Sequence, residues 1–86
     1  HGNDDADLIN VLSSIEGSPI ALIFVEQPND KVKVSWRARG KNWDVAQIAM
    51  SFGGGGHRAA AGATIKGSLS EIKPKVLRAT REILFG

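Results

Sequence analysis

The sequence contains no cysteine, no tyrosine and only two histidines among its 86 residues. The absence of cysteine excludes a disulfide framework and a thiolate metal site, and it fits a reducing, cytoplasmic location. No apolar run approaches the ~20 residues that a membrane helix requires, and no signal-peptide pattern opens the chain. We therefore expect a cytoplasmic domain without a membrane-spanning segment.

The length predicts one domain over residues 1–86. Ordinary contents of apolar and charged residues argue against disorder, and the sequence has no internal repeat or low-complexity tail. His1-Gly2 resembles the remnant of a purification tag, so we assign it no role.

Charge is unevenly distributed along the chain, although the net charge is only +2. Residues 1–30 hold six of the nine acidic residues and no Lys or Arg, whereas residues 31–86 hold all eleven basic residues. This asymmetry is consistent with an anionic partner at one face. It is equally consistent with acids that cap one helix and bases that cover another.

The first half of the chain predicts a helix followed by a hairpin. Leu8, Leu12 and Ile15 recur at helical spacing, so we expect a helix over residues 4–16. The apolar run 20–25 predicts a strand covered on both faces or nearly so, and a turn then leads to a second strand over 31–39.

The predicted strand 31–39 alternates completely between apolar and polar residues. Val32, Val34, Trp36 and Ala38 point one way, so Trp36 is expected to face the core. The other side carries Lys31, Lys33, Ser35, Arg37 and Arg39. Such a basic face is most simply a solvated surface, and we expect that interpretation to hold for Lys31 and Lys33.

The second half predicts a helix, a glycine segment, a strand and a closing helix. Asp44 and Gln47 have capping-box spacing at the start of the first helix, and Gly53 suits its left-handed end. The apolar stripe of this helix is Val45, Ile48, Ala49 and Phe52. A short strand over 62–67 precedes a helix over 68–85, in which Pro74 lies near the first turn or bends the helix. The apolar stripe of the closing helix is Leu69, Ile72, Val76, Ala79 and Ile83.

The fold class that this pattern predicts is α+β. Helices are expected to pack on a small mixed or antiparallel sheet made of the hairpin and at least one further strand. The expected order is helix, strand, strand, helix, glycine segment, strand, helix.

The most unusual segment is SFGGGGHRAAAGAT at residues 51–64. A flexible linker is disfavoured, because linkers mix glycine with polar residues and because a linker here would leave two pieces too small to fold alone. A structural interpretation, in which small residues let a loop pass close to a helix or strand, is the serious alternative. Each glycine costs ~0.5–1 kcal/mol relative to alanine. Four in a row therefore favour a backbone kept bare for a ligand.

Phosphate is the ligand that best suits exposed backbone N–H groups. The segment is not a P-loop, because His57-Arg58 stands where Gly-Lys-Ser/Thr is required, and it is not a dinucleotide fingerprint, because a helix precedes it. His57 can donate a hydrogen bond to a phosphate oxygen. Arg37 offers a bidentate fork, with Ser35 two residues away on the same side. For each residue the plain alternative is a solvated surface group.

Two motifs make the sequence similar to the DHH-associated domain, the C-terminal half of DHH-family phosphoesterases. The more specific is Gly54-Gly55-Gly56-His57 followed by Ala60-Ala61-Gly62, and the second is Ser35-Trp36-Arg37. The resemblance covers residues 20–84. The family includes RecJ-type exonucleases, nanoRNases that also dephosphorylate pAp, and cyclic-dinucleotide phosphodiesterases. Gly53 and the small residues fit the nanoRNase branch best.

The resemblance implies a substrate-binding half of an active site. In such enzymes an N-terminal DHH domain holds two metal ions, usually Mn²⁺, and the C-terminal domain grips the nucleotide across a cleft. Carried over to this chain, the phosphate or nucleotide end would be bound by Ser35, Arg37, Gly53, Gly54, Gly55, Gly56, His57 and Arg58. His57 would have at most an assisting role in catalysis.

The chain lacks the catalytic half that the resemblance implies. It has no Asp-His-His motif, and two histidines without cysteine give no two-metal cage. We therefore expect no catalytic residue, no cofactor of its own and little activity in this chain alone. The expected partners are a DHH catalytic domain and a short oligonucleotide, pAp or a cyclic dinucleotide.

Two alternatives belong to other classes. In the first alternative, the chain is a stand-alone module for single-stranded nucleic acid, with the basic strand as its binding face and Trp43 as a stacking platform. Alternatively it is a structural dimerisation domain, and a homodimer is in any case an expectation that the sequence leaves open.

Overall fold

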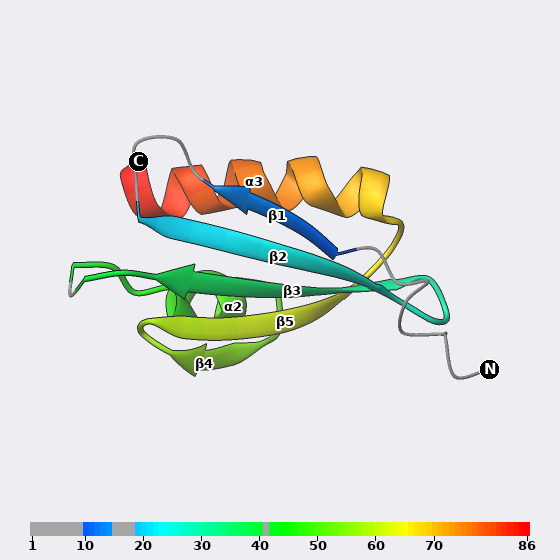
Figure 1. The fold of residues 1–86 in the computed structure, drawn as a ribbon, viewed down its shortest axis with the longest axis horizontal. Helices are drawn as coiled ribbons and strands as arrows, with labels where there is room; N and C mark the ends of the chain where they lie inside the picture. The colour runs from blue at the N-terminus through cyan, green and yellow to red at the C-terminus, as the bar shows by residue number, and fades with distance from the viewer. Residues whose placement is uncertain (1–9, 15–18, 41) are drawn as a thin grey trace.

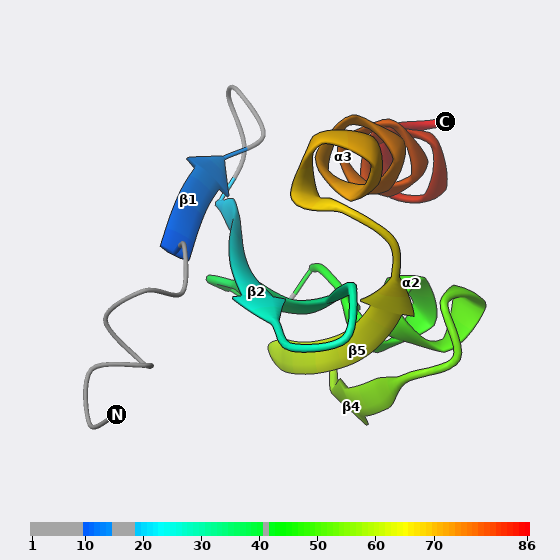
Figure 2. The ribbon, with the colours of Figure 1, turned by 90° about the vertical axis from the view of Figure 1, so that its right-hand side faces the viewer.

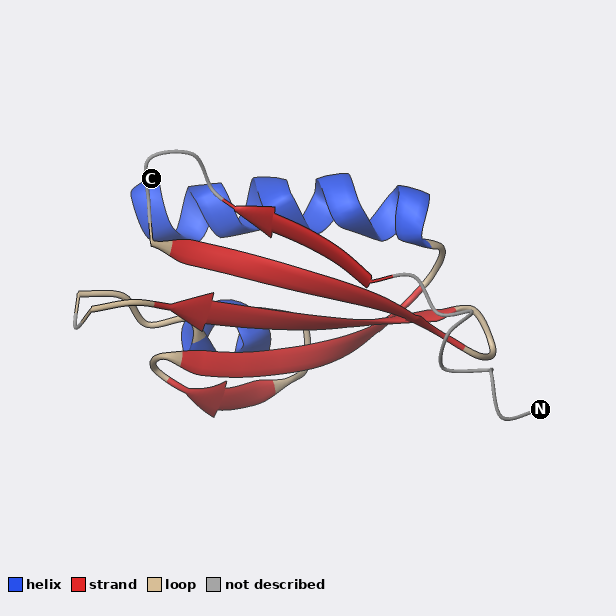
Figure 3. Ribbon diagram, in the orientation of Figure 1, coloured by secondary structure: helices blue, strands red, loops and turns tan. Residues whose placement is uncertain are grey.

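The fold is a curved antiparallel sheet with two helices on one of its faces (Figures 1 and 3). The computed structural model describes residues 10–14, 19–40 and 42–86. Along the chain the elements are β1 (Asn10–Ser14), β2 (Ile20–Gln27), β3 (Lys31–Ala38), α2 (Ala46–Ser51), β4 (Gly55–His57), β5 (Ala60–Lys66) and α3 (Leu69–Phe85). The sheet order is β1-β2-β3-β5-β4, and the α+β prediction is confirmed.

The predicted first helix is wrong where the structure describes it. Residues 10–14 form β1, which pairs antiparallel with β2, with Leu12 opposite Ile23. The sequence of these five residues, NVLSS, fits a helix or a strand, and pairing with the edge of β2 satisfies its backbone groups without a helix. The remainder of the predicted helix, residues 4–9 and 15–16, lies outside the described residues.

The glycine segment also contains an unpredicted strand. Residues 55–57 form β4 and pair antiparallel with β5 through a hairpin whose connection is Arg58-Ala59. Glycine has a low strand propensity, so only the pairing with β5 makes this stretch extended. The predicted strand over 62–67 is confirmed, with β5 beginning at Ala60.

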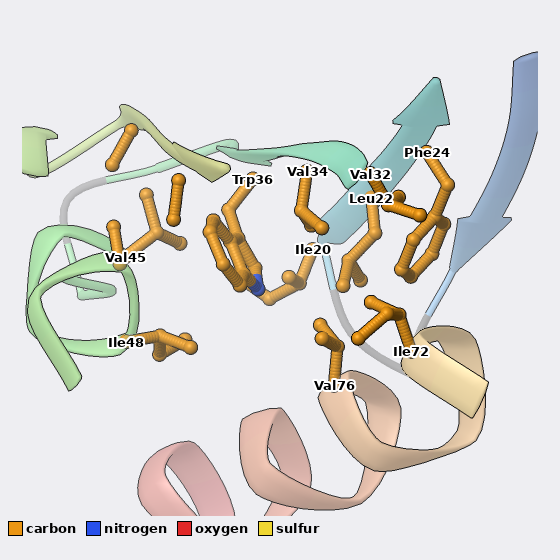
Figure 4. Close-up of a cluster of buried hydrophobic side chains, with 13 residues drawn as sticks. Ile20, Leu22, Phe24, Val32, Val34, Trp36, Val45, Ile48, Ile72 and Val76 are labelled. Atoms are coloured by element: carbon orange, nitrogen blue, oxygen red, sulfur yellow. The ribbon is translucent and has the colours of Figure 1, made fainter. Parts of the chain in front are cut away.

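Both helices cover the same face of the sheet (Figure 2). The core lies between them and the sheet, where Trp36 and Val34 meet Ile48 from α2 and Val76 from α3 (Figure 4). The predicted alternation of β3 is confirmed, because Val32, Val34 and Trp36 are buried while Lys31, Lys33 and Arg37 are exposed. Burial in β2 also alternates at first, with Ile20, Leu22 and Phe24 buried and Ala21, Ile23 and Val25 half-buried. The other face of the sheet carries no helix among the described residues.

The helix ends differ in part from the predictions. The capping box predicted at Asp44 does not form: the Asp44 carboxylate accepts from the Ala46 N–H (3.1 Å), and α2 has Val45 as its N-cap without a side-chain hydrogen bond. A capping box forms instead at the start of α3, between Ser68 and Glu71. Pro74 lies inside α3, beyond its first turn.

The apolar stripe of α3 is confirmed except at its end. Ile72 and Val76 are buried, whereas Ile83 is 40% exposed. The prediction for Ile83 is wrong because the helical period of 3.6 residues turns the stripe past it, so that Leu84 packs against the core instead. No helix in the described part of the chain is long and apolar enough to cross a membrane.

One buried hydrogen bond ties β3 to α3. The Trp36 Nε1–H donates to Thr80 Oγ1 (3.0 Å), and the Thr80 hydroxyl donates in turn to the Val76 carbonyl (2.7 Å). Both Trp36 and Thr80 are fully buried. The indole ring also stacks on Phe52, with ring centroids 6.0 Å apart. Trp36 therefore connects β3 to α3 and to the end of α2.

Replacing Thr80 by valine is expected to destabilise the fold by about 1–3 kcal/mol, because the buried Trp36 N–H loses its acceptor. The same substitution at Thr64, which is exposed on β5, is the control and is expected to change stability by at most ~0.5 kcal/mol. Urea denaturation of both variants measures the difference. Equal effects of the two substitutions would contradict a specific role for the Trp36–Thr80 bond.

Candidate functional site

The glycine run begins as the end of α2. Gly53 has a φ of 85°, and its N–H donates to the Met50 carbonyl (3.0 Å). The Gly54 N–H donates to the Ala49 carbonyl (2.8 Å), which completes a Schellman motif. The predicted left-handed helix end at Gly53 is confirmed. The N–H groups of Gly53 and Gly54 thus already have partners in the helix.

Gly54 and Gly56 are also constrained by close contact with β5. A Cβ at Gly54 would lie 2.7 Å from the Ala63 Cα, and one at Gly56 would lie 2.5 Å from the Ala61 Cα. Gly56 in addition has a φ of 148°, which disfavours an L side chain. Backbone packing therefore requires glycine at both positions.

Gly55 is the glycine of the run that the fold does not require. A Cβ built there would meet nothing within 4 Å, and its φ is not positive. Because it pairs with Gly62 on β5, Gly55 presents bare backbone beside the face of the sheet that carries no helix. The structure thus separates a glycine with no role in packing from three that maintain the fold.

The strand register brings the predicted polar residues to this same face. Directly opposed residues of neighbouring strands point to the same side of a sheet. Ser35 opposes Gly62, which in turn opposes Gly55. Arg37 opposes Ala60 on β5.

Residues that oppose one another on neighbouring strands form a row across the sheet, and the row that contains Arg37 ends at His57. His57 opposes Ala60 from the other side, so two strand spacings of about 4.8 Å separate the Cα atoms of Arg37 and His57. Both side chains are exposed, and the small Ala60 lies between them. The arrangement leaves room for an anion between the guanidinium and imidazole groups.

An open pocket of ≈ 270 Å³ lies on this face. Its lining residues come from β3, β4 and β5: Lys33, Ser35, Arg37, Gly55, Gly56, Ala60, Ala61 and Gly62. A Cβ added at Gly62 would lie 3.9 Å from the Ser35 Oγ. The Ser35 hydroxyl is therefore next to the bare floor of the pocket.

Four of the eight predicted site residues line this pocket: Ser35, Arg37, Gly55 and Gly56. His57 lies in the same row across the sheet as Arg37 and Ala60, and Gly53 and Gly54 end α2. Arg58 lies in the β4–β5 turn, where its carbonyl accepts from the Val45 N–H (2.9 Å).

The sequence interpretation missed Lys33, which was predicted to be merely solvated. The alternation of β3 already places Lys33 on the side of Ser35 and Arg37, so the signal was present in the sequence.

The pocket has a positive electrostatic character. Its lining includes Lys33 and Arg37 and no carboxylate. The residues of β2 that face the same side are Ala21, Ile23 and Val25, which carry no charge. Within the described residues no group of three or more His, Asp or Glu side chains could hold a metal ion. The lining of the pocket is therefore suited to bind an anion.

A family match agrees with these residues. The DHHA1 domain family matches residues 1–84. The chain belongs to this family. The membership confirms the resemblance inferred from the glycine–histidine motif and from Ser35-Trp36-Arg37, and the pocket of the DHHA1 domain is built from residues of both motifs.

Relatives of this DHHA1 domain occur within longer proteins. It is 42% identical over 82 residues to a Thermus thermophilus protein named "Bifunctional oligoribonuclease and PAP phosphatase NrnA", covering 94% of this chain and 25% of that protein. Proteins of the same name from Mycoplasma genitalium and Mycoplasma pneumoniae are 39% and 37% identical, over 80% and 76% of this chain and 22% and 19% of theirs. The chain thus spans about a quarter or less of the relatives that it matches.

The division of roles among the glycines predicts different effects of alanine at neighbouring positions. Gly54→Ala is expected to destabilise the DHHA1 domain by about 1–3 kcal/mol, because the new methyl group overlaps β5. Gly55→Ala is expected to change stability by at most ~0.5 kcal/mol, because the space is empty. Thermal unfolding of both variants checks this, and a loss of stability in Gly55→Ala would show that Gly55 also has a role in the fold.

Proposed function

We propose that this DHHA1 domain is the phosphate-binding half of a phosphoesterase active site. The observation that carries the proposal is the convergence of Ser35, Arg37 and the bare Gly55 backbone on one pocket without a carboxylate. A guanidinium binds two phosphate oxygens at once, a hydroxyl adds one donor, and the missing side chain at Gly55 lets a phosphate come close to the sheet. Such a donor set is complementary to a phosphate group.

The individual residues would act by binding and orienting the substrate. Arg37 would hold the phosphate in a bidentate manner, Ser35 would donate its hydroxyl proton, and Lys33 would neutralise further charge. The two-residue connection makes His57 and Ala60 a hydrogen-bonded pair, so the Gly56 N–H is directed to the outer edge of β4, where a phosphate oxygen can accept it. His57 would donate from the far end of the row that contains Arg37 and Ala60.

The chemical step would belong to a separate DHH catalytic domain. The described residues of this chain offer no metal-binding cluster, so Mn²⁺, which supplies nucleophile activation and charge neutralisation in two-metal sites, would be held by Asp and His residues of that domain. This chain would hold the phosphate toward it. By itself the chain is expected to bind ligand and to hydrolyse little or nothing.

The names of the relatives support short oligoribonucleotides and PAP (pAp) as the substrates of the whole protein. Both ligands carry phosphate esters on a nucleoside, which the donors of this pocket would recognise without reading the base. A cyclic dinucleotide, a cytoplasmic location and a homodimer stay predictions.

The alternative of a stacking module for single strands has less support. Trp36 is fully buried, and Trp43 is partly buried against the core. The residues of β2, β3 and β5 on the open face include no aromatic side chain in the described part of the chain. These three strands therefore offer no platform for base stacking, and the exposed imidazole of His57 on β4 is the aromatic ring that this face presents.

Arg37→Ala is expected to weaken binding of pAp about tenfold or more, because the variant cannot make the charge-assisted bidentate hydrogen bonds to phosphate. Arg78→Ala, on the exposed side of α3, removes the same charge from the helical face and is expected to leave binding within twofold. NMR titration with pAp measures both dissociation constants, and shifts of the wild-type chain should centre on residues 35–37 and 55–57. Equal binding by the two variants would refute the proposed site.

Gly55→Ala is expected to weaken binding of pAp several-fold in a domain of unchanged stability, because the methyl group would occupy the approach to the backbone. The same NMR titration provides the measurement, and the unfolding curve of the variant provides the control. Wild-type affinity in a folded Gly55→Ala variant would mean that the ligand does not approach the backbone at this residue.

A further inference from the structure

The positive face of the sheet extends well beyond the phosphate pocket. Lys33 on β3 opposes Thr64 on β5, and one register row further Lys31 opposes Lys66. Both members of the Lys31–Lys66 row are exposed. Two like charges directly opposite each other on a sheet are destabilising, so the fold gains nothing from this pair.

Carboxylates lie near one end of the pair without forming an ion pair with it: Glu26 and Asp30 line an open hollow together with Lys31. Neither lysine forms an ion pair with a described residue. On the neighbouring strand Gln27 opposes Lys31, and Glu26 opposes the buried Val32, which directs Glu26 to the helical side. Asp30 lies in the preceding turn at a φ of 60°. The row thus places two positive charges without an ion-pair partner among the described residues at the end of the sheet opposite Arg37, with Asp30 and Glu26 offsetting part of the charge on the Lys31 side.

The distance from this row to the pocket suits a short nucleic-acid chain. Lys31 precedes Ser35 by four residues and Arg37 by six, which at about 3.4 Å per residue corresponds to roughly 14 and 20 Å along β3. Even at the axial rise of about 3.4 Å per nucleotide of a duplex strand, which is shorter than the advance of an extended strand, six nucleotides cover this span. The described side chains that line the way on β2 are the uncharged Ile23 and Val25.

We propose that Lys31 and Lys66 form a second phosphate subsite, which holds the body of an oligonucleotide whose terminal phosphate occupies the Ser35–Arg37 pocket. Lys33, between the two, would contact an intervening phosphate. The inference rests on the proposed function and adds a prediction about substrate length. A dinucleotide or pAp would fill only the pocket, whereas a chain of about six nucleotides would reach both sites.

The test compares 5′-phosphorylated oligoadenylates of two and six nucleotides by NMR titration at low salt. In the wild-type chain the hexanucleotide is expected to bind about tenfold more tightly than the dinucleotide. Lys31→Gln/Lys66→Gln should remove most of this advantage while dinucleotide binding stays within twofold. The salt dependence of hexanucleotide binding should also fall, by about 0.7 in logarithmic slope for each phosphate that the variant no longer neutralises.

The matched control is Lys75→Gln/Arg78→Gln, which removes the same charge from exposed positions on α3. The control is expected to preserve the length dependence. The subsite is refuted if the control lowers hexanucleotide binding as much as Lys31→Gln/Lys66→Gln does, or if the latter variant keeps the wild-type length dependence.

Failure of the proposed function would look different. In that case Arg37→Ala would leave dinucleotide binding unchanged, or the wild-type chain would bind neither oligonucleotide. If Arg37→Ala weakens both lengths and Lys31→Gln/Lys66→Gln weakens neither, the phosphate pocket stands and only the second subsite is wrong.

Discussion

The burial of the Trp36 indole is the interaction on which both parts of the candidate site depend. Trp36 lies between Ser35 and Arg37 on β3, and its N–H is held by Thr80 of α3. Its ring stacks on Phe52, the residue immediately before Gly53. The same side chain therefore sets the position of the polar strand and of the helix end from which the glycine strand starts. Because the backbones on either side of Trp36 are fixed, Ser35 and Arg37 face the pocket with little freedom in their Cα positions.

Because β3 alternates strictly, burial of its apolar residues places its polar residues together on the opposite face of the sheet. Residues that alternate with Val32, Val34 and Trp36 must project from the opposite face. Both helices cover the first face, so the second is left for polar and small residues. The glycine and alanine residues of β4 and β5 have little or no side chain, so no bulky group fills the space beside Arg37 on that face. The polar face of the strand contributes little to stability. It can therefore form a pocket floor and a row of hydrogen-bond donors for phosphate.

Local patterns in the sequence predicted the elements that their own residues determine. The helix 68–85, the alternation of β3 and the left-handed end at Gly53 each depend on spacing within a few residues, and each is confirmed. The pattern failed for residues 10–14, because pairing with β2 decides their conformation. It failed for residues 55–57 for the same reason, since glycine alone does not favour a strand. These strands depend on partners distant in the sequence, which periodicity does not reveal.

The candidate site was predicted as a set of residues but not as an arrangement. Apart from the helix end at Gly53, the sequence suggested one role, ligand binding, for the glycines. The structure gives them three roles: Gly53 ends a helix, Gly54 and Gly56 allow β4 to approach β5, and Gly55 faces open space. This distribution follows from contacts across strands, so it is absent from the linear motif. The requirement for a close approach explains why the run is long, and the open space at Gly55 indicates where a ligand could reach the backbone. Glycine is therefore needed in this run for two reasons. Gly54 and Gly56 allow close packing of β4 on β5, and Gly55 leaves the backbone accessible to a ligand.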